Sequence, residues 1–202
     1  MSIDNNKESG EKEKKTSDIF SAMPQALKLR AAVLFFINEL PEKLDRIKLC
    51  KHLFYADGHY FQKYSKPITE LPYLHVEGSP QPVFFNEIFH LMLAKGEIEV
   101  VPNIEKENSS EGRPLVMKGF VYKTSILFED LFSRDEKKVL KSIASLLKGS
   151  MMLETRYFPN LYQNYVQTPL YETIYFKELP AGKRPHLLWK AWAKKVFRLL
   201  GE

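Results

Sequence analysis

The residues most able to do chemistry lie in the stretch HLFYADGHYFQKYSKPIT, residues 52–69. His52, Asp57 and His59 are the side chains there that could transfer a proton or bind a metal ion. His52 and His59 are seven residues apart and share roughly one helix face, but no carboxylate obviously faces them. Asp57 and His59 are two residues apart, which turns them about 200° from each other on a helix. The spacing therefore favours histidines at the edge of an aromatic core over a metal site or an acid–base pair.

The rest of the sequence lacks the motifs of familiar enzyme classes. It contains no G-x-S-x-G, no H-E-x-x-H, no P-loop and no G-x-G-x-x-G. Cys50 is the only cysteine, so neither an intramolecular disulfide nor a cysteine-based zinc site can form. We therefore expect a protein that is not an enzyme and that holds no metal or cofactor.

The composition is that of a globular protein. The 202 residues are 44% hydrophobic, 13% aromatic and 27% charged, which suits a chain with one core. No apolar run approaches the roughly 20 residues of a membrane span, and the N-terminus lacks an apolar signal core. Together with the single cysteine, this predicts a cytoplasmic protein without membrane contact.

The charge is unevenly distributed along the chain. The formal net charge is +5, and residues 1–18 hold four Lys against five Asp or Glu, which leaves +6 for the remainder. Because this segment has one apolar residue after the initiator, we expect residues 1–18 to be a disordered charged tail. Residues 19–202 are expected to form a single domain. Their positive charge makes nucleic acid a candidate partner, although the surplus is scattered.

Two helices are expected at the start of this domain. Apolar periodicity predicts the first over residues 24–40, with Pro24 in its first turn. The second is expected to begin at Pro41 and Glu42 and to run to residue 64 as the central helix of the core. Its apolar stripe is formed by Leu44, Ile47, Phe54 and Phe61.

The next part of the chain alternates extended and helical patterns. Residues 65–82 hold four prolines and should form an extended connection with at most a short edge strand. A helix that begins near residue 83 should end at Gly96. Two short strands, 98–102 and 118–125, should flank a long loop over residues 103–114.

A capping-box pattern marks the helix that follows. Ser133, with Glu136 three residues later, predicts a helix start, and the apolar pattern continues to Gly149. The aromatic segment 155–182 has no clear pattern, and residues 185–200 are predicted to form a terminal helix. This order predicts an α+β fold that is predominantly α-helical, a compact helical domain with a small β-hairpin and a faint likeness to a winged helix.

The terminal helix is amphipathic and basic, which allows three interpretations. It could dock on its own domain, bind a partner protein or lie on a membrane surface, and docking is favoured over partner contact. The candidate partner-binding residues on this helix are Trp189, Trp192, Lys194 and Arg198.

Several segments together resemble the Panacea domain, also called the SocA-like antitoxin domain. They are KLCKHLFYADGHYF at 48–61, KPIT at 66–69, Tyr73, and GSPQPVFFNEIFHLMLAKGEIEVV at 78–101. The resemblance extends over about residues 28–180. The residues that carry the family motif, interpreted as structural, are Tyr55, Asp57, Pro67, Ile68, Thr69, Tyr73 and Gly78.

The resemblance implies an antitoxin. Family members are usually encoded beside a toxin gene or in prophage regions and neutralise toxins by direct protein contact. An adaptor role, in which the antitoxin delivers its toxin to a protease, is also known in the family. A cognate toxin protein, and a protease as a further candidate, are therefore the expected partners.

Asp57 has a physical interpretation within this motif. A carboxylate in the middle of a buried helix is costly unless donors reach it, and the KPIT turn offers such donors, Thr69 among them. The leading hypothesis is an antitoxin-type binding protein. A winged-helix-like DNA-binding regulator is the alternative, and an enzyme that uses Asp57 with His52 or His59 is a third hypothesis.

Overall fold

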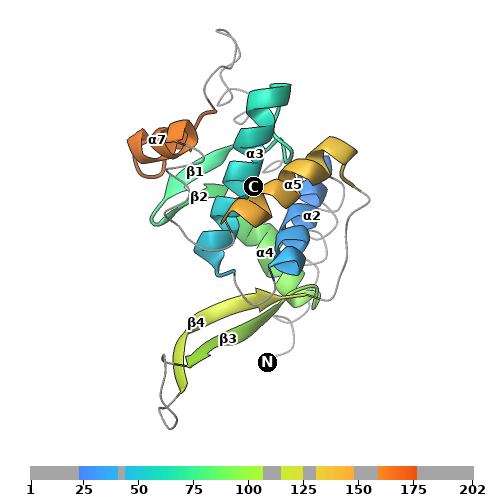
Figure 1. The fold of residues 1–202 in the computed structure, drawn as a ribbon, viewed down its shortest axis with the longest axis vertical. Coiled ribbons are helices and arrows are strands. Elements are labelled where there is room, and N and C mark those ends of the chain that lie inside the picture. The colour runs from blue at the N-terminus through green and yellow to red at the C-terminus, as the bar shows by residue number, and fades with distance from the viewer. Residues whose placement is uncertain (1–22, 41–43, 107–114, 125–130, 148–158, 177–202) are drawn as a thin grey trace, which may run out of the picture.

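The computed structural model describes residues 23–40, 44–106, 115–124, 131–147 and 159–176 (Figure 1). Five helices occur in these ranges: α2 (Pro24–Glu39), α3 (Arg46–Tyr64), α4 (Phe85–Ala94), α5 (Arg134–Leu147) and α7 (Pro159–Gln167). Strands β1 (Tyr73–Val76), β2 (Ser79–Pro82) and β5 (Thr173–Ile174) form a sheet in the order β2-β1-β5, and β3 (Glu99–Lys106) pairs with β4 (Leu115–Lys123). Both sheets are antiparallel, and the predicted α+β, predominantly helical fold is confirmed. Within these ranges, no helix is both long and apolar enough to cross a bilayer.

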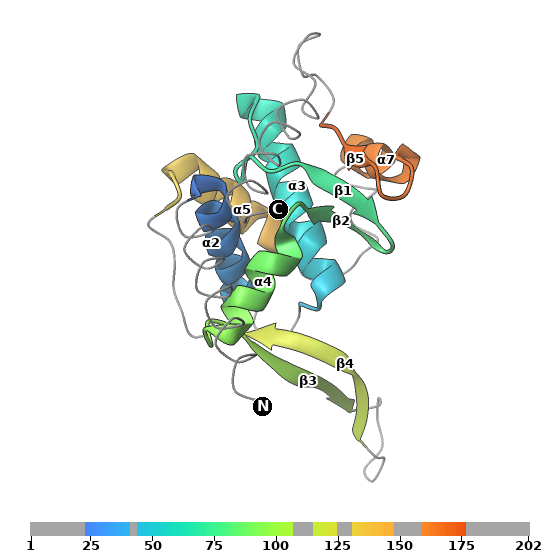
Figure 2. The ribbon, with the colours of Figure 1, turned by 180° about the vertical axis from the view of Figure 1, so that it is seen from behind.

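Helix α3 is the centre of the molecule, as the sequence predicts. Figures 1 and 2 show it between α2 and α5 on one side and β1, β2 and α7 on the other. Twelve of its 19 residues are buried, so it is covered on almost every side. The β3–β4 hairpin projects from the opposite end of the molecule to the last turn of α3 (Figures 1 and 2).

The predicted start of this central helix is wrong. Leu44 and Asp45 lie outside α3, and the Asp45 side chain caps it by accepting a hydrogen bond from the Lys48 N–H (2.8 Å). An aspartate that caps the first turn begins a helix more effectively than the prolines and glutamates before it. The predicted apolar stripe also fails at Ile47, whose side chain is 42% exposed. Leu44 is buried all the same, and its carbonyl oxygen accepts from the Tyr122 N–H of β4 (3.0 Å).

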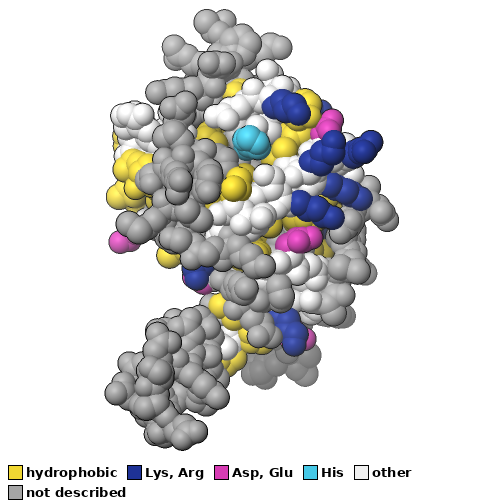
Figure 3. All heavy atoms as spheres, viewed as in Figure 1, with side chains coloured by type: hydrophobic (Ala, Val, Ile, Leu, Met, Phe, Trp, Pro, Cys, Tyr) yellow, Lys and Arg dark blue, Asp and Glu magenta, His cyan; other side chains and the backbone are white. Residues whose placement is uncertain are grey.

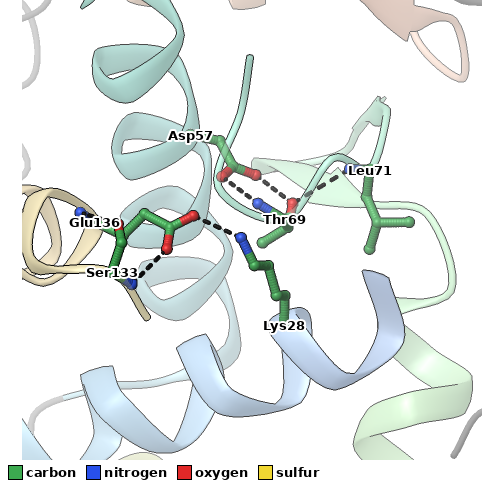
Figure 4. Close-up of polar contacts among 6 residues, drawn as sticks. All are labelled: Lys28, Asp57, Thr69, Leu71, Ser133 and Glu136. Atoms are coloured by element: carbon green, nitrogen blue, oxygen red, sulfur yellow. Dashed lines mark hydrogen bonds and ion pairs between the residues drawn. The ribbon is translucent and has the colours of Figure 1, made fainter. Parts of the chain in front are cut away.

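The predicted capping box at the start of α5 is confirmed. The Ser133 N–H donates to Glu136 Oε2 (2.8 Å), and the Glu136 N–H donates to Ser133 Oγ (3.2 Å). Glu136 also accepts from Lys28 Nζ of α2 (2.5 Å), as Figure 4 shows. One carboxylate therefore both starts α5 and ties it to α2.

Helix α4 ends where the sequence predicts. Gly96 has a φ of 67°, and its N–H donates to the Leu93 carbonyl oxygen while the Glu97 N–H donates to that of Met92. This pair of bonds is a Schellman motif, which favours glycine at the left-handed position. Glu97 then receives two 2.7 Å hydrogen bonds from the Arg30 guanidinium of α2, which fixes this end of α4.

The structure contains more strands than the single small hairpin that the sequence predicts. Residues 73–82, expected to hold at most one short edge strand, form the β1–β2 hairpin, and the uninterpreted aromatic segment supplies α7 and β5. Residues 103–106, predicted as loop, extend β3 beyond an irregularity between Pro102 and Ile104. Cross-strand pairing with β4 outweighs the polar composition of this stretch, because each paired residue satisfies its backbone groups in the ladder.

Gly58 allows α7 to pack closely against α3. A Cβ atom at this position would lie 2.6 Å from Leu161 Cδ1 and 3.0 Å from Phe176 Cε1. Leu161 is buried at 3% exposure, so it has little room to move away. Only glycine fits between α3 and α7 without a shift of one of them.

Several predictions fall outside the described residues. They concern the charged tail at 1–18, loop residues 107–114 and the terminal helix at 185–200. The single domain over 19–202 therefore stays a prediction.

Candidate functional site

Asp57 lies at the centre of the motif and is almost completely buried. Its exposed fraction is 1%, and its carboxylate points from α3 to the turn that follows the helix (Figure 4). Oδ1 accepts from the Thr69 N–H (2.9 Å), and Oδ2 accepts from the Thr69 hydroxyl. The predicted hydrogen bonding between Asp57 and Thr69 is thus confirmed, and both carboxylate oxygens have donors.

The turn between α3 and β1 takes its shape from these contacts. It begins at Ser65, which closes α3 with a φ of 56°, and it includes Glu70, also at 56°. Positive φ values are unfavourable for side chains other than glycine, so the turn needs support from its surroundings. Thr69 gives that support, because its hydroxyl donates to Asp57 and accepts from the Leu71 N–H (3.4 Å).

The Tyr73 hydroxyl is the third hydrogen-bond donor to Asp57, after the N–H and the hydroxyl of Thr69. It donates to Asp57 Oδ2 (2.8 Å), and the Tyr73 side chain is fully buried. The ring packs edge-on against Phe54 of α3 (5.3 Å between centroids) and against Phe176 (5.8 Å). Because Tyr73 opens β1, the middle strand of its sheet, this contact joins α3 to the sheet.

Burial governs the ionisation of both groups. It raises the pKa of the Asp57 carboxyl from its ordinary 3.8 to about 6, against the opposing effect of the hydrogen bonds from Thr69 and Tyr73. Burial and the nearby Asp57 charge raise the pKa of Tyr73 well above its ordinary value. Tyr73 therefore keeps the proton that it donates, and Asp57 is largely ionised near neutral pH.

The other motif residues lie in the core or in turns. Tyr55 and Ile68 are buried, and Pro67 is half-buried at the entry to the KPIT turn. Gly78 ends the two-residue turn between β1 and β2 with a φ of 83°, which glycine adopts readily. These positions offer little side-chain surface to a partner.

The histidines do not form a metal site within the described residues, where no group of three metal-binding side chains occurs. His52 is 4% exposed; its Nδ1–H donates to the Lys48 carbonyl oxygen (2.7 Å), and its ring lies against Phe36. Its Nε2 atom is buried without a hydrogen-bond partner. Burial lowers the pKa of His52 to about 4, so the ring is neutral at physiological pH. His59 is half-buried and points elsewhere on the helix than Asp57.

The candidate partner-binding residues of the terminal helix cannot be placed. Trp189, Trp192, Lys194 and Arg198 all lie outside the described residues. Their role stays a prediction.

Sequence reasoning missed two residues of this region. Tyr73 was recognised in the motif but not as a donor to Asp57, because a tyrosine 16 residues away carries no local signal. Gly58 was overlooked, although a glycine in the middle of a helix costs about 1 kcal/mol relative to alanine and usually indicates close packing.

Comparison with known proteins gives one match. A family model described as the antitoxin SocA-like, Panacea domain matches residues 49–151. These residues include the whole Asp57 site, from α3 through the turn to β1, and continue through α5. No curated protein and no solved structure matches.

The hydrogen bonds of Asp57 should contribute measurably to stability. Asp57→Asn should lower the free energy of unfolding by about 2–4 kcal/mol, because an amide nitrogen cannot accept the hydroxyl hydrogen bonds of Thr69 and Tyr73. Thr69→Val should lower it by about 1–3 kcal/mol, because the buried carboxylate loses one of its three donors. The double variant should cost at least about 1 kcal/mol less than the sum, since both substitutions remove the same contact. Urea unfolding curves measure these values.

Thr124→Val is the matched control for this cycle. The Thr124 hydroxyl donates to the Glu97 carbonyl oxygen (2.5 Å), away from Asp57. Its cost should add to that of Asp57→Asn within about 0.5 kcal/mol. Strict additivity of the Asp57 and Thr69 substitutions would show that the two side chains are not coupled.

Asp57 and His52, two buried titratable groups of α3, should make contributions to stability that change with pH in opposite directions. Between pH 3.8 and about 6, folded Asp57 holds a proton that the unfolded chain has released, so its contribution to stability falls as pH rises. Between about pH 4 and 6.5, the unfolded chain holds a proton that folded His52 lacks, so this contribution rises with pH. Each amounts to about 3 kcal/mol, and in the native protein they nearly cancel.

Two variants should separate these contributions when unfolding is measured between about pH 4 and 6. Relative to the native protein, Asp57→Asn should gain stability as pH rises, because the variant lacks the buried carboxyl whose ionisation destabilises the folded state. His52→Leu should lose stability relative to the native protein over the same range. Parallel profiles for all three proteins would show that neither group titrates differently in the folded state.

Proposed function

The chain belongs to the antitoxin SocA-like, Panacea domain family, and we propose that it neutralises a cognate toxin by direct protein–protein contact. The family match, which extends over about half of the chain, supports a toxin as the partner. In this proposal the protein is not an enzyme, needs no cofactor and acts in the cytoplasm, in a toxin–antitoxin or prophage-associated system.

The burial of Asp57 is the observation that carries the proposal. A catalytic carboxylate must reach a substrate, whereas this one is 1% exposed and accepts hydrogen bonds from Thr69 and Tyr73 of its own motif. The motif that resembles the family therefore supports the fold, and recognition is left to the surface around it. A protein that acts by binding alone needs no catalytic side chain.

Delivery of the toxin to a protease is a finer form of the same proposal. An adaptor must bind two proteins at once, so it needs a second surface apart from the one that contacts the toxin. The exposed apolar side chains of α7 and the turn after it, Val166, Leu170 and Tyr171, are candidates for such a surface.

A winged-helix-like DNA-binding regulator is the second candidate function. The cations of α5 favour it, since basic helices attract phosphate. However, the β3–β4 hairpin, which would be the wing, projects from the lower end of the molecule, whereas α5 lies beside α2 and α3 in its middle (Figures 1 and 2). A recognition helix and its wing have to contact one duplex together, so this arrangement favours protein binding.

Coexpression tests the proposed function. The product of the gene adjacent to this one should arrest growth when expressed alone, and coexpression of this chain should restore growth. The two proteins should elute together in size-exclusion chromatography. A neighbouring product that is harmless alone and that forms no complex with this chain would contradict the proposal.

A further inference from the structure

The exposed side of α5 and the last turn of α3 form a positively charged surface. We define it by Lys63, Arg134, Lys138 and Lys141, all of them exposed, and call it the basic face. We propose that the basic face binds an acidic patch on the toxin. This inference rests on the proposed function and adds to it the location and the chemistry of the contact.

The sequence of α5 places its cations on one side. Arg134, Lys138 and Lys141 are four and three residues apart, so they line two turns of the helix over about 10 Å. The side toward the core holds the buried residues Glu136, Val139, Leu140, Ile143, Ala144 and Leu147. Figure 3 shows lysine and arginine side chains gathered over the position of α5 in Figure 1.

The end of α3 continues this surface. Helices α3 and α5 pack against each other, and Tyr60 near the end of α3 lies beside Ser133 and Glu136 at the start of α5. Lys63 is exposed, and its ammonium group lies 5.1 Å from the centre of the Tyr64 ring. Tyr64 is half-buried. The basic face thus has an aromatic side chain at its edge, and Tyr and Arg are frequent at the centres of protein interfaces.

The positions of these cations do not favour the stability of α5. The helix dipole favours Asp135 and Glu136 in the first turn of α5 but not Arg134, which lies there as well, and the last turn holds no cation. Like charges four residues apart, such as Arg134 and Lys138, also repel each other. Arg134 and its repulsion from Lys138 therefore do not stabilise α5, and contact with a partner would explain these two cations.

The acidic residues of α5 do not balance the positive charge of this helix. The helix carries four cations and two carboxylates. Glu136 faces inward and pairs with Lys28, and Asp135 lies 3.8 Å from Lys138 in an exposed, weak ion pair. A net positive surface therefore remains, which complements an acidic surface and speeds association with it.

An acidic protein fits this surface better than nucleic acid does. Asp135 lies among the cations, where it would repel every phosphate of a uniformly negative backbone, whereas an acidic protein patch can place a cation opposite it. The cations extend along two turns of one helix, and the β3–β4 hairpin projects from another part of the molecule, so it does not continue this surface (Figure 1). Binding of DNA is retained as an outcome of the test.

Charge reversal on the full chain tests the proposal. The variant K138E/K141E should associate with the purified product of the adjacent gene at least about tenfold more slowly than wild type at low salt, because steering is reversed. The difference should shrink as salt rises. Stopped-flow or surface plasmon resonance measures the rates, and thermal melting verifies that both proteins are folded.

K95E/K123E is the matched control. Both lysines are exposed and lie outside the basic face, and the change in net charge is the same. This variant should associate within about threefold of wild type. A general effect of net charge would slow both double variants equally and would overturn the proposal.

Three further outcomes are decisive. If wild type forms no complex with the neighbouring product, the proposed function itself fails. If wild type and K138E/K141E bind equally fast, the proposed function stands and the basic face is wrong. If K138E/K141E binds the protein normally but loses affinity for a DNA duplex of about 20 base pairs that wild type binds, the basic face serves nucleic acid.

Discussion

The buried Asp57 carboxylate is the constraint on which the rest of the structure depends. A charge inside an aromatic core is costly unless donors surround it, so the chain after α3 has to return and bring them. Thr69 supplies its N–H and its hydroxyl, and Tyr73 supplies a second hydroxyl. These three donors determine the path of the turn and hold β1, with its neighbours β2 and β5, against α3. The removal of one carboxylate would loosen the helix, the turn and the sheet together.

In this arrangement, the residues that support the fold differ from those that are available for recognition. Most motif side chains lie in the core, where a substitution disturbs packing, whereas the exposed sides of α5 and α7 can vary at little cost to stability. Under the proposed function, such a division would let one scaffold present different surfaces to different toxins. Among the described residues of this chain, the basic face is the surface that we propose for this contact.

Sequence reasoning succeeded where a local rule applies. The capping box of Ser133 and Glu136, the terminating Gly96 and the Asp57–Thr69 contact follow from residue types at short spacing. It failed where distant parts of the chain meet: Tyr73 reaches Asp57, and Gly58 makes room for Leu161 of α7. The start of α3 was misplaced because Asp45 competes with Pro41 as a helix start, and only the folded backbone shows which one caps.

Amide hydrogen exchange, compared between the free protein and its complex with the neighbouring gene product, tests the central claim most directly: the motif supports the fold while a surface makes the contact. The amides of Thr69 and Tyr73 should exchange slowly in both states and change little on binding. Protection should increase in α5 and in the last turn of α3. An increase confined to the Asp57 turn, with α5 unchanged, would contradict the claim.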